Sequence, residues 1–135
     1  MVPMNNPTPS EGFLVYPSQT SVAETVRLIQ AAAGSKGVEV FAVIDHAAGA
    51  RSVGLEMPET QVVILGNPKA GTQLMLQAPA LAIDLPIRVL VRAKPPGSEV
   101  LLHDPHLVAS RYGLGDEQAE VLAGIARLVQ AALAG

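Results

Sequence analysis

The sequence contains no cysteine, and only 16% of its residues are charged. Without cysteine the chain has no disulfide, no thiolate nucleophile and no Cys-based zinc or iron–sulfur site, so any metal would need histidine and carboxylate ligands. Runs of lysine or arginine are also missing, and the formal net charge is -3. Because a nucleic-acid binder normally carries a basic patch, we predict no nucleic-acid partner.

Long apolar runs and a secretory leader are missing as well. The longest apolar stretches, such as residues 62–65 and 78–83, are far shorter than the roughly 20 residues that cross a bilayer. Residues 1–12 lack a basic segment followed by an apolar one, so we expect a loose lead-in rather than a signal peptide. These features predict a soluble, cytoplasmic protein with no membrane partner.

Apolar residues are abundant: 49% of the 135 residues are hydrophobic. This content and this length suffice for one covered core, so we predict a single domain over residues 13–135. The local patterns predict strands at residues 13–16, 38–44, 62–65, 87–93 and 99–103, helices at 22–33 and from 116 to the C-terminus, and short helices at 45–53 and 72–77.

The ends of these elements carry their own signals. Ser21 and Glu24 have the spacing of a capping box at the first helix, and Asp116 is expected to cap the last one. Residues 95–98 (PPGS) predict a turn of an antiparallel hairpin. We expect strands 38–44 and 62–65 at the centre of the sheet. The order of elements predicts a two-layer α+β domain with a largely antiparallel sheet backed by two helices.

Asp45 and His46 are the first candidates for chemistry, because they lie where a buried strand gives way to a helix and strand ends open onto clefts. A carboxylate at this position can assist an imidazole that acts as a general acid or base. Asp45 also has a sufficient structural role as a helix cap, and adjacent strand residues point to opposite faces. For His46, a ligand role, an acid/base role and a hydrogen-bonded core position all stay open.

The segment GNPKAGT at residues 66–72 is the second candidate. Free amides at a helix start, together with Lys69, can hold an anion. A P-loop nucleotide triphosphatase is rejected, because Gly71 stands where the P-loop lysine would precede the threonine. The structural alternative is that Asn67 caps the helix, Pro68 is its first residue and Gly71 permits tight packing.

Two further groups are weaker candidates. His103, Asp104 and His106 offer metal-ligating side chains, but the geometry of a strand running into a loop would separate the histidines, and we predict no metal site. Asp84, followed by Leu85 and Pro86, is either a turn cap or a carboxylate facing a cleft. No motif identifies a cofactor.

Three motifs stand in a fixed order along the chain: IDHA within residues 41–48, GNPKAGT at 66–72, and DLP at the end of 82–86. Together with residues 54–60 they resemble the domain-of-unknown-function 302 (DUF302) family over about residues 13–113. The resemblance implies a β-α-β(4)-α domain of the TATA-binding-protein-like kind, usually seen as a homodimer, with no established activity.

The resemblance also marks positions in this sequence. The family's motif residues fall on Asp45, His46, Asn67, Pro68, Lys69, Gly71, Asp84 and Pro86. Many relatives carry a tyrosine near the end of the last strand, where this chain has His103, so a role of that hydroxyl does not transfer. The architectural kinship does not transfer DNA binding to so acidic a chain either.

Three functional hypotheses follow. The first is a homodimeric module whose cleft, lined by His46, Asn67, Lys69 and Asp84, binds a small anionic molecule. The second is an enzyme in which Asp45 and His46 form an acid/base pair while Lys69 holds an oxyanion. The third is a purely structural dimer in which the motif residues cap turns or seal the dimer.

Overall fold

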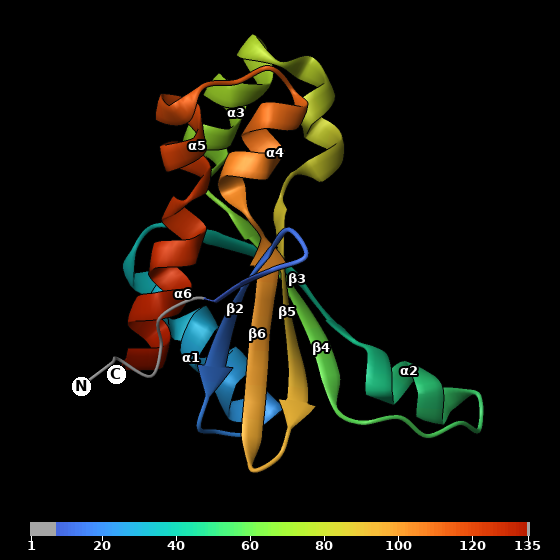
Figure 1. Ribbon diagram of the computed structural model, residues 1–135. Helices are drawn as coiled ribbons and strands as arrows, with labels where there is room; N and C mark the ends of the chain where they lie inside the picture. The colour runs from blue at the N-terminus through green and yellow to red at the C-terminus, as the bar shows by residue number, and fades with distance from the viewer. Residues whose placement is uncertain (1–7, 135) are drawn as a thin grey trace.

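The computed structural model describes residues 8–134 (Figure 1). Its elements in chain order are β1 (Thr8–Ser10), β2 (Phe13–Ser18), α1 (Val22–Ser35), β3 (Glu39–Asp45), α2 (His46–Ser52), β4 (Thr60–Gly66), α3 (Pro68–Gln77), the short 3-10 helix η1 (Pro79–Asp84), β5 (Ile87–Lys94), β6 (Gly97–His103), α4 (Pro105–Arg111), α5 (Asp116–Leu122) and α6 (Gly124–Ala134). The strands form one sheet in the order β1-β2-β6-β5-β4-β3, and every neighbouring pair is antiparallel.

The molecule has two main layers, as the sequence predicts. Helices α1 and α6 contact each other and lie on the same face of the sheet, while α3, η1, α4 and α5 gather beyond one end of the strands (Figure 1). The core between the two layers consists mainly of aliphatic side chains from both, among them the fully buried Ile29, Val63, Val89, Val100 and Val129. Burying this apolar surface is the main term that favours the fold.

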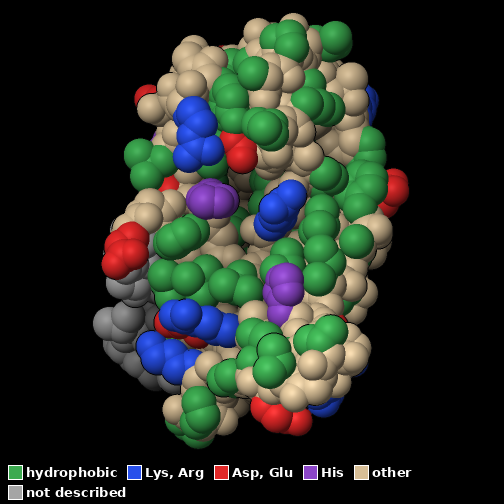
Figure 2. Space-filling model, turned by 90° about the vertical axis from the view of Figure 1, so that its right-hand side faces the viewer, with side chains coloured by type: hydrophobic (Ala, Val, Ile, Leu, Met, Phe, Trp, Pro, Cys, Tyr) green, Lys and Arg blue, Asp and Glu red, His purple; other side chains and the backbone are tan. Residues whose placement is uncertain are grey.

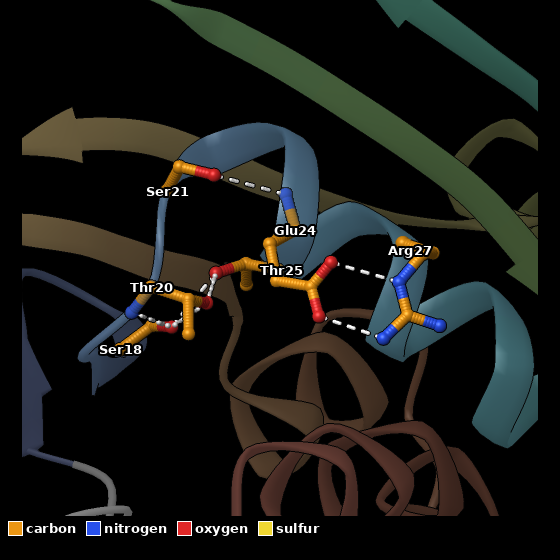
Figure 3. Close-up of polar contacts among 6 residues, drawn as sticks. All are labelled: Ser18, Thr20, Ser21, Glu24, Thr25 and Arg27. Atoms are coloured by element: carbon orange, nitrogen blue, oxygen red, sulfur yellow. Dashed lines mark hydrogen bonds and ion pairs between the residues drawn. The ribbon is translucent and has the colours of Figure 1, made fainter.

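The start of α1 follows the local sequence signal. The Ser21 side chain accepts a hydrogen bond from the Glu24 backbone N–H at 3.1 Å (Figure 3). The Glu24 carboxylate pairs instead with Arg27, whose Nε and Nη2 donate to it at 2.8 and 2.6 Å. The Ser21 half of the predicted capping box is therefore confirmed, while Glu24 forms an ion pair along the helix in place of the expected bond to the Ser21 amide.

A buried group of hydroxyls joins α1 to the sheet. Thr25 is fully buried, and its Oγ1 lies 2.7 Å from the Ser18 hydroxyl, 2.8 Å from that of Thr20 and 3.0 Å from that of Ser98. The Ser98 hydroxyl in turn donates to the Thr20 carbonyl at 2.9 Å. Next to Ser98, a Cβ on Gly97 would lie 2.1 Å from the Ser18 carbonyl oxygen, so only glycine fits where β6 begins.

Strand β3 corrects one prediction. It was expected at the centre of the sheet, but it lies at the edge, next to β4 alone. Phe41, Val43 and Ile44 on this strand are 47%, 39% and 42% exposed. Residues 40–44 of this strand are all apolar, and such a run is compatible either with burial on both faces or with an edge position that leaves apolar side chains in solvent. The sequence pattern therefore did not distinguish a central strand from an edge strand.

The C-terminal helix is the second correction. A single helix capped by Asp116 was predicted, but Ala123 separates α5 from α6, and Gly115 is the N-cap residue. The Gln118 side chain accepts a hydrogen bond from the Gly115 N–H at 3.0 Å, while Asp116 is the first helical residue. Gly124 follows the break, in keeping with the poor helix propensity of glycine.

The N-terminal segment differs in part from the expected lead-in. Residues 8–10 form β1 and pair with β2, while residues 1–7 lie outside the described part of the chain. From residue 8 to residue 134, no helix combines the length and the apolar character needed to cross a membrane.

Candidate functional site

A groove of about 730 Å³ lies between α3 and the two C-terminal helices. The ends of β4 and β5 contribute to its wall through Gly66 and Ile87. Most of its lining is apolar, with contributions from Val38, Phe41, Leu74, Met75, Leu85, Pro86, Val121, Leu122, Ile125 and Leu128. The groove exists because α3 stands off from α6, so the apolar side chains of both helices face a shared space.

Few polar side chains line this groove, and two of them are cationic: Lys36 and Arg127. Lys36 is the C-cap residue of α1, is exposed, and takes part in no ion pair within residues 8–134. Arg127 Nη1 lies 3.3 Å from a Glu120 carboxylate oxygen, and Nη2 donates to the Glu120 carbonyl at 2.9 Å. Lys36 is therefore the cation of the groove that no carboxylate of the described residues neutralises.

The GNPKAGT segment supplies one end of the groove. Asn67 caps α3, and its Oδ1 accepts hydrogen bonds from the backbone amides of Lys69 at 3.0 Å and Ala70 at 3.2 Å. Pro68 is the first helical residue. The structural interpretation of these two residues is confirmed, and it removes two amides that an anion at this helix start would have used.

Gly71 and Lys69 differ in their relation to the groove. Gly71 lines it, and a Cβ at this position would lie 3.8 Å from Leu85 Cδ1, which is ordinary contact rather than a clash. Tight packing therefore does not require glycine here. Lys69 is exposed and lies outside the lining of the groove, so its predicted role in holding an anion has no support from its position.

Asp45 and His46 lie at the other end of the sheet, which corrects the predicted cleft. In the register of β3 with β4, Asp45 pairs with Gln61 whereas Glu39 pairs with Gly66. Six residues of strand, about 20 Å, therefore separate Asp45 from the start of the GNPKAGT segment. Within one chain, His46 cannot share a cleft with Asn67.

The two side chains also have different local roles. The Asp45 carboxylate accepts a hydrogen bond from the Ala48 N–H at 2.9 Å and so caps α2, as predicted, and Gly54 follows this helix with a φ of 79°. His46 is exposed, so the predicted alternative of a core histidine is wrong. Its imidazole forms no hydrogen bond with other described residues.

Asp84 binds two side chains that the sequence reasoning missed. Its Oδ2 accepts hydrogen bonds from Arg111 Nη1 at 3.0 Å and from the Tyr112 hydroxyl. The hydrogen bond to Asp84 raises the pKa of the Tyr112 hydroxyl above its ordinary value. Asp84 therefore links η1 to the end of α4, and it lies outside the lining of the groove. No local signal connects residues 27 positions apart, so only an alignment or a structure would have found this pair.

The histidines near α4 have separate surroundings. The His103 ring lies on Phe13, with the ring centroids 5.1 Å apart. His106 lies 3.8 Å from an Asp116 oxygen and 3.4 Å from a Glu120 oxygen, and Asp104 caps α4 through the His106 amide. In residues 8–134, no group of three histidine or carboxylate side chains is arranged to hold a metal ion.

The groove itself was not predicted. Its signal was an excess of apolar residues on the last helix: Val121 belongs to the predicted buried stripe, yet it is 44% exposed and lines the groove. If the apolar stripe of a helix is wider than the area that packs on the sheet, the remaining apolar residues can indicate a second binding surface.

Comparisons with known proteins identify the family and give partial matches to longer proteins. The family model described as "Domain of unknown function DUF302" matches residues 14–132. Over 105 residues, 77% of this chain, the sequence is 42% identical to "Fluoride-specific ion channel FluC 1" of Brucella suis biovar 1 (strain 1330) and to "Fluoride-specific ion channel FluC 2" of Brucella melitensis biotype 1, covering 41% and 39% of those proteins. This chain thus spans about two fifths of the length of the curated relatives it matches.

A solved structure supports the fold. The crystal structure of an uncharacterized conserved protein DUF302 from Bacillus stearothermophilus has a TM-score of 0.77 to this chain at 14% identity, covering 92% of this chain and 97% of the other. The common architecture is α+β with helices packed on an antiparallel sheet, as the resemblance implied. With a family model that matches nearly the whole described chain and a solved member that shares its fold, the protein belongs to the DUF302 family.

Proposed function

We propose that the protein is a small-molecule-binding module, and that its groove takes a ligand with an apolar body and one anionic group. The observation that carries this proposal is the pairing of a mostly apolar groove with Lys36, a cation without an ion-pair partner in the described chain. A volume of about 730 Å³ is in the range of pockets that hold drug-sized molecules.

The lining explains the kind of ligand. An apolar body would replace water beside Leu74, Met75 and Ile125, which gains free energy in proportion to the area covered. The anionic group would lie near Lys36, while Asn67 and Thr72 offer polar contacts in the N-terminal half of α3. The proposal keeps the predicted anionic ligand and the residues Asn67 and Gly71, but it moves the site away from His46, Lys69 and Asp84.

Titration with decanoate, followed by amide NMR, tests the proposal. We expect shifts at the residues of α3, α6 and the end of β4, weaker binding of decanol, and no such shifts with inorganic phosphate alone. Met75→Trp would fill the groove and abolish decanoate binding, whereas Leu76→Trp, on the same helix but 78% exposed and outside the groove, would leave it unchanged. Lys36→Gln should weaken decanoate but not decanol.

Two other results would speak against a ligand in the groove. Decanoate binding that survives Met75→Trp, or shifts that lie away from the groove, would refute the site. Absence of any binding by both amphiphiles would favour the purely structural hypothesis.

We also propose that the protein is a homodimer formed through β3. This edge strand has backbone groups that no other described strand pairs with, and it keeps Phe41, Val43 and Ile44 exposed. An exposed apolar edge is a template for pairing with another strand, and two identical edges pair isologously about a two-fold axis.

Such a dimer would bring the two separated motifs together. If β3 pairs antiparallel with its copy about Ala42, Asp45 faces the partner's Glu39 at about 5 Å instead of lying about 20 Å from its own Glu39. His46 would then adjoin the partner's groove end. The enzyme hypothesis, with Asp45 and His46 as an acid/base pair, is a proposal only in this two-chain form.

Light scattering at micromolar concentration tests the dimer. The wild type should have twice the mass of one chain, Val43→Lys should have the mass of one chain, and Leu76→Lys, an exposed position on α3, should remain dimeric. A wild type with the mass of one chain would refute the dimer and with it the shared position of His46, but not the groove.

Channel activity is not proposed for this chain, because the match covers only about two fifths of the FluC relatives. The cytoplasmic location stays a prediction from the sequence.

A further inference from the structure

An apolar row crosses the sheet on the face opposite α1 and α6, which we call the open face. The strand registers place Val15 beside Leu101, Leu101 beside Leu90, Leu90 beside Val62, and Val62 beside Ile44. These five side chains form one continuous line across β2, β6, β5, β4 and β3. The first four are partly exposed, and Ile44 is 42% exposed.

Basic residues flank this row on both sides. Arg88 lies two residues before Leu90 on β5 and Arg92 lies two residues after it, and both side chains are exposed on the open face. Lys94 lies beyond Arg92, and His103 on β6 lies with Arg88 in the lining of a small hollow. Figure 2 shows this side of the molecule as a hollowed, largely hydrophobic area with Lys, Arg and His side chains around it.

The charge of the open face is opposite in sign to that of the chain. Glu99, on the same face, is nearly buried and accepts hydrogen bonds from Arg92 Nε and Nη2 at 2.9 and 2.7 Å and from Lys94 Nζ at 3.2 Å. Arg88 takes part in no ion pair within residues 8–134. The exposed Glu39 at the start of β3 also lies on this face, because it pairs with Gly66 while the neighbouring Val40 and Leu65 face the core. Three cations and two carboxylates give this face an excess of one positive charge, although the whole chain has a net charge of -3.

The dimensions of the row match those of one helix. Five strands about 4.8 Å apart make a row about 19 Å long, which corresponds to roughly 13 residues of α-helix. Arg88 and Arg92 each lie about 6.6 Å from Leu90 along β5, on opposite sides of the apolar row. The two arginine positions are therefore about 13 Å apart, which is close to the 10–12 Å diameter of a helix with its side chains.

We propose that the open face is a docking surface for an amphipathic helix of a partner protein, with an apolar stripe that lies on the row and acidic residues along both borders of the stripe. Apolar contacts with Leu90 and Leu101 provide the affinity, and the two basic borders fix the position of the helix. The small-molecule groove is a different surface, lined from the other side of the sheet, so this proposal does not depend on it.

A synthetic helical peptide tests the proposal. It has about 14 residues, with leucines at helical spacing and glutamates on both borders of the leucine stripe, and a fluorophore for anisotropy. We expect saturable binding to the wild-type protein, and about tenfold weaker binding when lysines replace the glutamates.

Charge reversal on the protein provides the decisive control. Arg88→Glu should weaken the glutamate peptide about tenfold and strengthen the lysine peptide, whereas Lys69→Glu, which changes the net charge equally at an exposed site on α3, should change neither. If Arg88→Glu fails to fold, the comparison of the two peptides on the wild type still decides. Equal affinity for both peptides, or Arg88-dependent binding of phosphatidylserine vesicles without peptide binding, would overturn the proposal.

Discussion

The two faces of the sheet carry similar aliphatic residues but differ in their surroundings. On β6, Leu102 points toward α1 and α6 and is 2% exposed, whereas its neighbour Leu101 points to the open face and is partly exposed. The covered face has no charged residue among its buried members, while the open face has Arg88, Arg92 and Lys94 beside its apolar row. Similar apolar content therefore serves the core on one face and offers a binding surface on the other.

This difference shows that the alternation of side chains along a strand tells which residues share a face of the sheet, but not whether another layer covers that face. A strand with leucines on both faces is fully buried if both layers are present, and half-buried if one is missing. Among residues 8–134, no helix covers the apolar row, and exposed cations stand beside it on β5.

The largest effect is expected from truncating leucines on β6. Leu102→Ala should lower the free energy of unfolding by about 2–5 kcal/mol, because it leaves a cavity in the core, and Leu101→Ala should cost less, because solvent already reaches that site. Urea denaturation of both variants measures the difference. Equal losses would mean that the open face is covered in solution, and the comparison of the two faces would fail.

A smaller effect is expected at the buried hydroxyls that join α1 to β6. Thr25→Val keeps the shape but removes the hydroxyl that Ser18, Thr20 and Ser98 share, so it should cost about 1–3 kcal/mol. Thr72→Val, at an exposed position on α3, should change stability by less than about 0.5 kcal/mol. Thermal or urea unfolding of both variants measures the effect, and a neutral Thr25→Val would show that the hydroxyl group adds no net stability.

The smallest expected effect concerns the pH dependence of the open face. Burial raises the pKa of the Glu99 carboxyl, but the hydrogen bonds from Arg92 and Lys94 outweigh it and hold this pKa below its ordinary value. A carboxyl whose pKa is lower in the folded state adds stability above its unfolded pKa of roughly 4.3 and loses it as the pH falls through the folded value.

Glu99→Gln measures this contribution. The stability difference between wild type and variant should be constant above about pH 5 and shrink as the pH falls below about 4. A difference that stays the same at every pH would contradict the assigned ion pairs, since it would show that the charge of Glu99 adds nothing.

Local signals predicted most of the fold. Ser21, Asp45 and Asn67 cap helices because their side chains reach amides two or three residues away, and the turn at residues 95–98 joins two paired strands. Such interactions are encoded within a few residues, so a single sequence reveals them. The edge position of β3 depends on which strands pair, and that depends on contacts distant in sequence.

The candidate sites depended on the same distant contacts. Asp45 and Asn67 each follow an apolar strand, and the sequence suggested one cleft for both, but antiparallel neighbours place their C-terminal ends at opposite sides of the sheet. The bond between Asp84 and Arg111 and the row from Val15 to Ile44 depend on long-range packing and on register. Neither leaves a local pattern.

The most direct test of the ligand groove is an intermolecular NOE experiment with decanoate and protein labelled at its methionine methyl groups. Met75 lines the groove, and Met57, 39% exposed in the segment after α2, provides the internal control. We predict NOEs from the decanoate methylene protons to the Met75 methyl group and none to that of Met57. Contacts with Met57 but not Met75, or no contact with either at saturating decanoate, would contradict the proposed site.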